Sequence, residues 1–274
     1  MSEIWHLFLF QPLVSALVVF FKFFGNLGVA IVALTVFIRL ILVPLTLPSM
    51  RAQKKMAELA PEIEKLKKKF GQDKKKLATA QMELYRRSGA NPAAGCLPMI
   101  VQLLILVALY QAFIQVLHSD GAQVITKINE TVYPFLRLSA ETTINLSFLY
   151  LDLSKPDVIR LSGLPLPGLF LILAALTQFL SGKMAAPAVK AAQKEAQKTP
   201  VKTDDFATTM QSQMILLFPL MTIFIGYSFP SGLILYWFIF SAFQLVQQYI
   251  FSGWGGLRPW VEKTPFFKET EKSV

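Results

Sequence analysis

The sequence predicts an all-α, polytopic membrane protein with five membrane-spanning helices. Of its 274 residues, 54% are apolar and only 16% are charged, whereas a typical soluble domain carries about 25% charged residues. Such a chain cannot cover a globular surface with polar groups, but lipid can solvate an apolar outer face. The mean hydropathy of +0.49 agrees, and the charges gather in a few stretches between the apolar ones.

Residues 1–24 form an apolar segment with two interpretations. Gln11, Ser15, Val18 and Lys22 share one helical face, which favours an external amphipathic helix lying in the membrane interface. A sixth span is the alternative. The segment lacks the basic start of a secretory signal, so we expect no leader.

The five expected spans follow from the length of the apolar stretches, since crossing lipid takes roughly 20 residues. Residues 206–251 hold no charge and would measure about 69 Å as one helix. We therefore expect two helices there, separated by the turn residues Phe229-Pro230-Ser231-Gly232. The spans are predicted at residues 25–48, 94–117, 163–183, 212–229 and 231–251.

Lys and Arg are distributed unevenly among the loops of this chain, whose net charge is +10. Residues 49–93 hold 12 Lys and Arg against five Asp and Glu, whereas the loop 118–162 holds four against five. By the positive-inside rule, the first loop lies in the cytoplasm and the second outside. The N-terminus is then outside, and the loop 184–211, which reads as mobile, and the short tail 252–274 are cytoplasmic.

The first cytoplasmic loop predicts a helical hairpin. Apolar residues at helical spacing run through 56–70 and again through 77–84. Gly71 suits the end of the first helix and Asp73 the start of the second, while Pro61 starts or kinks the first. The basic surface of the hairpin either enforces topology or docks a partner, and these two interpretations are compatible.

Arg39 is the only charge in the interior of an expected span, since Lys183 is the last residue of the third. Its insertion costs about 3 kcal/mol, against about −4 to −8 kcal/mol from the apolar residues of that helix. No expected span contains Asp or Glu, so Arg39 needs neutral polar partners or a water-filled groove. A positive charge there suits a peptide segment crossing the membrane, because its polar groups need partners in lipid. The candidate groove residues are Thr35 on the same helix and Gln102, Gln178, Ser241 and Gln244 on others.

Composition argues against several other classes of protein. One Cys and two His make a zinc site and an internal disulfide poor interpretations. The spans lack Asp, Glu and His, so we expect no catalytic residue, no metal, no cofactor and no enzyme activity. We also expect no DNA partner and no small-molecule substrate. The alternative that stays open is a small anion-binding transporter or channel built around Arg39, although the sequence shows no internal repeat.

Five stretches, in order along the chain, resemble the YidC/Oxa/Alb family of membrane protein insertases, in the short bacterial form without a large external domain. They are Gly28–Thr35 with Arg39 and Pro44, Ala60-Pro61-Glu62-Ile63 through Phe70 and Asp73, Asn91-Pro92 through Gln102, FLYLDLSKPD at 148–157, and Phe229–Leu233 with Leu235-Tyr236-Trp237.

The resemblance implies a five-helix core with a hydrophilic groove in which Arg39 contacts an incoming substrate. Gln178 and Trp237 would line this groove, and Thr35 and Tyr236 would contact substrate. Ser241 departs from the Asn that the family usually carries. The cytoplasmic hairpin would recruit substrate through Pro61, Glu62, Lys67, Lys68, Lys69 and Asp73.

The resemblance also implies partners and a location. Nascent membrane proteins and the lipid bilayer are the expected partners, and the Sec translocon and the ribosome are further candidates. The expected location is the bacterial inner membrane. The tail has a net charge of only +1, which argues against ribosome binding through the tail.

Overall fold

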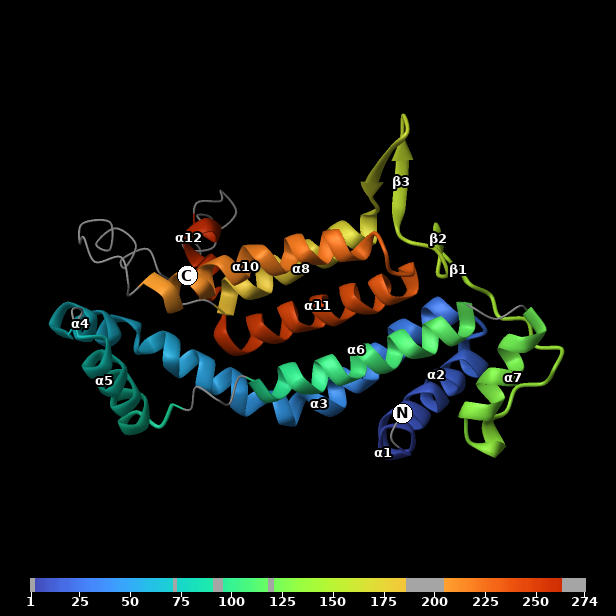
Figure 1. The fold of residues 1–274 in the computed structure, drawn as a ribbon, viewed down its shortest axis with the longest axis horizontal. Helices are drawn as coiled ribbons and strands as arrows, with labels where there is room; N and C mark the ends of the chain where they lie inside the picture. Colours follow the sequence, from blue (N-terminus) through green and yellow to red (C-terminus); the bar gives the residue numbers. More distant parts are fainter. Residues whose placement is uncertain (1–2, 71–72, 91–95, 118–120, 186–204, 263–274) are drawn as a thin grey trace, which may run out of the picture. The chain divides into compact units, whose positions relative to one another are not determined.

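The computed structural model describes residues 3–70, 73–90, 96–117, 121–185 and 205–262, and it is mostly helical (Figure 1). The strands of the described residues form two separate antiparallel hairpins. The predicted all-α class is therefore confirmed. The helices are α1 Glu3–Trp5, η1 His6–Phe10, α2 Gln11–Phe24, α3 Leu27–Glu58, α4 Ala60–Phe70, α5 Lys74–Arg87, α6 Cys96–Leu117, α7 Gly121–Thr131, η3 Pro134–Leu136, α8 Leu169–Ala185, α10 Asp205–Gly226, α11 Ser231–Ser252, η4 Gly255–Leu257 and α12 Arg258–Val261, and the strands are β1 Ser147–Phe148, β2 Leu151–Asp152, β3 Val158–Leu161 and β4 Leu164–Pro167.

Several of these helices are apolar enough to cross a membrane. Among the described residues, the helical run Glu3–Phe24, α3 and α11 have both the length and the composition for a span. Shorter apolar helical segments lie at Ile100–Ala112, Leu169–Ala185 and Ile215–Gly226. The turn at Phe229 and Pro230 separates α10 from α11 as predicted.

Three helix boundaries differ from the ends of the predicted spans. Helix α3 does not stop at Pro48 but runs through Pro44 and Pro48 to Glu58, since a membrane helix tolerates proline where neighbouring groups satisfy the freed backbone. Helix α8 starts at Leu169 rather than near residue 163, because residues 164–167 pair with β3 as strand β4. Helix α10 also begins earlier than residue 212, at Asp205.

The predicted cytoplasmic hairpin consists of α4 and α5. Pro61 is the second residue of α4, where proline is tolerated. Asp73 caps α5, since its Oδ1 accepts a hydrogen bond of 3.1 Å from the backbone N–H of Lys76. The predicted turn residues 71 and 72 lie outside the described residues, as does most of the loop predicted to be mobile, residues 186–204.

The chain divides into two compact units. The first comprises Met1–Val43, Met99–Leu176 and Leu220–Phe243, and the second comprises Pro44–Pro98, Thr177–Pro219 and Gln244–Val274. A hydrophobic core fills the first unit, with residues from α2, α3, α6, α7, α8 and α11. Its most deeply buried side chains include Phe10, Ile31, Leu109, Leu171, Leu233, Ile234 and Leu235.

The polar face of residues 11–22 packs on protein. Ser15 is 2% exposed, and its Oγ accepts a hydrogen bond of 3.2 Å from the backbone N–H of Tyr133. Lys22 Nζ donates to the carbonyl of Arg137 at 3.0 Å. Lys22 itself is exposed, and the large exposed apolar side chains of this segment are Ile4, Leu7, Phe8, Val19, Phe23 and Phe24. The face that favoured an interfacial helix is thus a protein contact, and the interfacial placement stays a prediction.

The loop 148–157 holds the starts of α8 and α11. Asp157 is 2% exposed and accepts hydrogen bonds of 2.8 Å from the Tyr150 hydroxyl and from the backbone N–H of Leu171. At α11, the backbone N–H of Ser231 donates to the carbonyl of Lys155 at 2.7 Å, and the Ser231 hydroxyl donates to the carbonyl of Asp152 at 2.7 Å. These bonds satisfy N–H groups that a helix start leaves unpaired, and they fix two helices of the first unit at one end.

Candidate functional site

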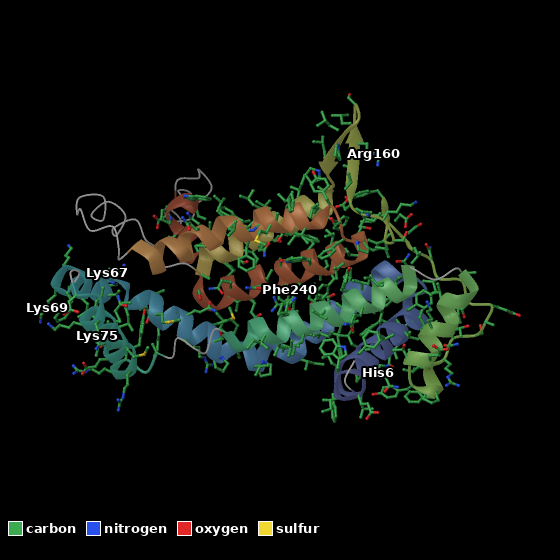
Figure 2. All side chains as sticks on the ribbon, in the orientation of Figure 1. His6, Lys67, Lys69, Lys75, Arg160 and Phe240 are labelled. Carbon is green, nitrogen blue, oxygen red and sulfur yellow. The ribbon has the colours of Figure 1, made fainter. Side chains whose placement is uncertain are left out.

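Arg39 is buried in the first unit, where α3 meets α11, and is only 7% exposed. Its Nη2 donates a hydrogen bond of 3.0 Å to the backbone carbonyl of Phe240. The guanidinium carbon lies 3.6 Å from the centroid of the Phe240 ring and 5.6 Å from that of Phe243, which is within the range of cation–π attraction. The arginine therefore uses a neutral carbonyl and aromatic faces, and Figure 2 labels Phe240 on α11.

Gln102 and Tyr236 form a second polar contact in the same unit. Gln102 Nε2 donates to the Tyr236 hydroxyl at 2.9 Å, and Tyr236 is 2% exposed. The rings of Tyr236 and Phe240 lie one helical turn apart on α11, with centroids 6.1 Å from each other. The structure thus brings predicted residues from α3, α6 and α11 to one region around Phe240.

The other predicted groove residues are placed as follows. The Thr35 hydroxyl is buried and donates to the carbonyl of Ile31 at 2.6 Å, the back-bonding common for threonine in helices. Ser241 is buried and Trp237 is half-buried, both in the first unit. Gln178 and Gln244 belong to the second unit.

A second polar contact between α3 and α11 lies in the second unit. Gln247 Nε2 donates to Thr46 Oγ1 at 2.8 Å, and both side chains are buried. The partners are 201 residues apart in sequence, the same offset as between Arg39 and Phe240. A constant positive offset is what two helices running in the same direction produce.

Phe240 and Phe243 were missed in the sequence. Only polar side chains were expected as partners of Arg39, although an aromatic face and a backbone carbonyl both attract a guanidinium. The sequence signal that could have indicated Phe240 as a partner of Arg39 was its position one turn after Tyr236 on the same helix.

The residues predicted for recruitment lie on the hairpin of the second unit. Pro61, Glu62, Lys68 and Lys69 are exposed, and Lys69 Nζ lies 5.2 Å from the Phe70 ring centroid. Figure 2 shows Lys67, Lys69 and Lys75 near one end of the hairpin. The backbone N–H of Lys76 lowers the pKa of Asp73. The hairpin therefore presents cations at the end where α5 is capped.

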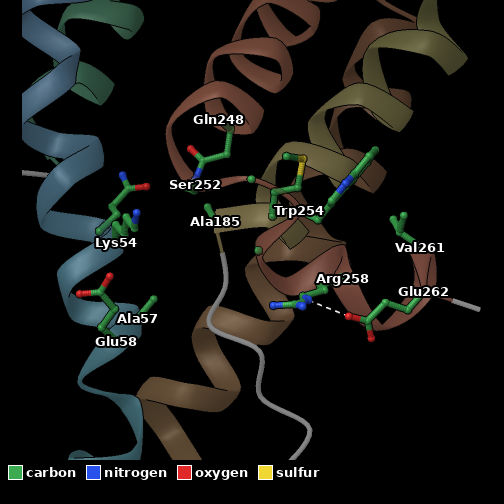
Figure 3. A pocket seen from close by; sticks show the side chains of 14 residues that line it. Lys54, Ala57, Glu58, Ala185, Gln248, Ser252, Trp254, Arg258, Val261 and Glu262 are labelled. Atoms are coloured by element: carbon green, nitrogen blue, oxygen red, sulfur yellow. Dashed lines mark hydrogen bonds and ion pairs between the residues drawn. The ribbon is translucent and has the colours of Figure 1, made fainter. Parts of the chain in front are cut away.

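A pocket of about 500 Å³ lies in the second unit, between α3, α8, α11 and the tail segment (Figure 3). Its charged residues are Lys54, Glu58, Arg258 and Glu262, of which Arg258 and Glu262 form an ion pair at 2.6 Å. Two cations and two anions balance, so the pocket has no net attraction for an anion. Among the described residues, no cluster of His, Cys, Asp and Glu could hold a metal ion.

Comparisons with known proteins identify the family of the chain. The family model described as 60Kd inner membrane protein matches residues 19–254. The membrane protein insertase YidC of Rickettsia conorii is 31% identical over 245 residues, which cover 89% of this chain and 39% of that protein. The membrane protein insertase YidC of Jannaschia sp. is 32% identical over 255 residues, which cover 93% and 37%. This chain thus spans less than half the length of these curated relatives, and neither relative's name supports an anion transporter. The chain belongs to the 60Kd inner membrane protein family, as the resemblance to YidC-type insertases predicted.

Proposed function

We propose that this chain is a membrane protein insertase and chaperone that receives its substrate at Arg39. The observation that carries the proposal is a buried arginine, within an apolar helix, that contacts a neutral carbonyl and aromatic rings. The apolar stretches of the five predicted spans contain no Asp or Glu. This layer of the protein therefore carries net positive charge.

The groove is proposed to consist of Arg39 with the surrounding polar and aromatic side chains. Arg39 has five N–H donors in a planar fork, which suit the carbonyl and carboxylate oxygens of a peptide. The other groove residues of the first unit in this proposal are Thr35, Gln102, Tyr236, Trp237 and Ser241, while a groove role for Gln178 and Gln244 stays a prediction from the sequence.

Insertion by this groove needs no covalent step. The polar flank of a nascent membrane protein exchanges its hydrogen bonds with water for hydrogen bonds with the donors of the groove. Its polar groups therefore travel a shorter distance through hydrocarbon without hydrogen-bond partners. Its carbonyl groups compete with that of Phe240 for the Arg39 guanidinium. The apolar helix of the substrate then moves into lipid, driven by burial worth about 25 cal/mol per Å².

The proposed topology places the N-terminus outside and the C-terminus in the cytoplasm of the inner membrane. Loop charges support it. The direction of α3 and α11 supports the odd number of crossings in this topology. The two contacts between α3 and α11 have the same sequence offset, so these helices run parallel. Two parallel spans need an odd number of membrane crossings between them. Helices α6, α8 and α10 would supply three.

The cytoplasmic hairpin is proposed to recruit nascent chains through its cations. Lys67, Lys68 and Lys69 lie together at the end of α4, beside the capped start of α5. A contact with ribosomal RNA would be salt-dependent through its phosphates, and neutralising these three lysines should weaken it. The Sec translocon remains a further candidate partner.

The test is insertion of a single-span substrate into proteoliposomes, scored by protease protection. Arg39→Glu should abolish insertion, because a carboxylate repels the carbonyl oxygens of both Phe240 and the substrate. Arg39→Lys should retain part of the activity, since it keeps the charge but loses the planar fork.

The matched control is Arg51→Glu, the same charge reversal at an exposed position of the same helix. It should leave insertion close to that of the unaltered chain. Full insertion by Arg39→Glu at an equal protein level would refute the groove mechanism.

A further inference from the structure

The β3–β4 hairpin has one purely aliphatic face. Its register pairs Ile159 with Leu166 and Leu161 with Leu164, and directly opposed residues of an antiparallel pair lie on the same face. Because side chains alternate along a strand, all four fall on one side. Their exposed fractions are 49%, 63%, 67% and 41%, in order of residue number. No described part of the chain covers this face.

The opposite face of the hairpin has a different composition. It carries Val158, Arg160, Pro165 and Pro167, and Arg160 is the only charged residue from Val158 to Pro167. Figure 2 shows Arg160 partway along the hairpin, clear of the helices. The single charge of the hairpin thus lies on the face opposite Ile159, Leu161, Leu164 and Leu166.

The hairpin is held by hydrogen bonds at its base and partway along β4. The backbone N–H of Gly168 donates to the carbonyl of Asp157 at 2.8 Å, and the Tyr227 hydroxyl donates to the carbonyl of Pro165 at 3.2 Å. At the tip, Ser162 and Gly163 both have positive φ, 51° and 85°, as a two-residue hairpin turn of the favoured kind requires. The aliphatic face therefore has a fixed place in the first unit.

The position of the hairpin indicates that lipid covers its aliphatic face. Strand β4 ends at Pro167, two residues before the apolar helix α8 begins. Figure 1 shows the hairpin running crosswise to α8, from the end where that helix starts. If α8 crosses the bilayer, a hairpin at this place lies along the membrane surface. An isolated two-stranded hairpin is only marginally stable in water, and lipid can cover the exposed face.

We propose that the β3–β4 hairpin is a membrane-surface anchor whose face of Ile159, Leu161, Leu164 and Leu166 lies in the lipid interface. Arg160, on the other face, remains at the level of the lipid phosphates. The absence of Asp and Glu from these ten residues removes repulsion from anionic lipids. The anchor goes beyond insertase activity and does not require it.

The test places a fluorescent label on adjacent residues of opposite faces. Leu161→Cys and Arg160→Cys are made separately in the full chain carrying Cys96→Ser, and each is labelled and reconstituted as one copy per lipid nanodisc. Quenching by lipids with doxyl groups at several depths then measures how deep each label lies. The label at residue 161 should lie about 5–10 Å into the headgroup and acyl boundary, the depth of interfacial amphipathic elements. The label at residue 160 should be reached by iodide from the water.

Two results would overturn the proposal. Equal access of iodide to both labels would show that lipid does not cover the aliphatic face. A label at residue 161 that is shielded from iodide but not quenched by any doxyl lipid would show that protein covers it. Leu164→Cys and Pro165→Cys form a second pair on opposite faces, so one misfolded variant would not decide the outcome.

Discussion

Replacing Gly168 with Ala should destabilise the protein by about 3 kcal/mol, because the new methyl group takes the place of a carboxylate. A Cβ at residue 168 would overlap the Asp157 side chain, whose Oδ2 lies 2.7 Å from it and whose Oδ1 lies closer still. Gly168 is not one of the glycines with positive φ, so alanine fits its backbone. The whole cost should therefore come from displacing Asp157.

The magnitude follows from what Asp157 holds. Its carboxylate accepts hydrogen bonds of 2.8 Å from Tyr150 and from the backbone of Leu171. Losing a helix cap costs about 0.5–2 kcal/mol, and a hydrogen bond to a charged group contributes about 1.5–3 kcal/mol. Release of a buried carboxylate to water offsets part of this loss. The sum is about 3 kcal/mol for Asp157→Ala and for Gly168→Ala alike.

The double variant makes this reasoning testable. Once Asp157→Ala has removed the carboxylate, Gly168→Ala meets no obstacle, so the two together should cost about 3–4 kcal/mol rather than about 6 kcal/mol. Denaturation of the four proteins in mixed detergent micelles, followed by tryptophan fluorescence, gives the free energies of unfolding. An additive double variant, or a Gly168→Ala protein as stable as the unaltered chain, would refute the clamp around Asp157.

Two further predictions concern the second unit. Thr46→Val alone should cost about 1–3 kcal/mol, because the buried Gln247 amide loses its acceptor, whereas Thr46→Val combined with Gln247→Leu should cost less than Thr46→Val alone; the same unfolding assay decides. The carboxyl of Asp73 should titrate below about 3.9 in the folded chain and should do so even in Lys76→Ala, since the backbone N–H of residue 76 is the main cause of its lowered pKa. Its contribution to stability is therefore present above the unfolded pKa and is lost as pH falls through the folded pKa, and NMR titration of the labelled carboxyl, with Asp73→Asn as the stability control, measures both. A normal pKa of Asp73 in Lys76→Ala would contradict the cap.

Arg39 shows how far sequence reasoning reached at the candidate site. A lone charge in an apolar helix, with no acid in the other spans, predicted a special environment and neutral partners. The structure gives it a carbonyl and two aromatic rings. Phe240 was not foreseen because a backbone carbonyl has no signature in sequence, and a phenylalanine in a membrane helix is ordinary.

Prolines show a different limit. The first span was predicted to end at Pro48, yet α3 runs through Pro44 and Pro48 to Glu58. Pro165 and Pro167 stand in β4 of a hairpin, where the third span was predicted to start. Each proline removes one backbone N–H donor. The surrounding structure decides whether the helix or strand ends there, bends, or continues unchanged.

By itself, the sequence determined that this is a helical membrane protein with a buried arginine, a capped basic hairpin and a family resemblance that the comparisons confirm. Hydropathy, charge and capping act over one helix at a time, so they can be read locally along the chain. Tertiary structure alone decided that Arg39 meets Phe240, that Asp157 caps the start of α8 and that four aliphatic side chains share one exposed strand face. These contacts depend on the register between elements, which packing fixes and which no single segment contains.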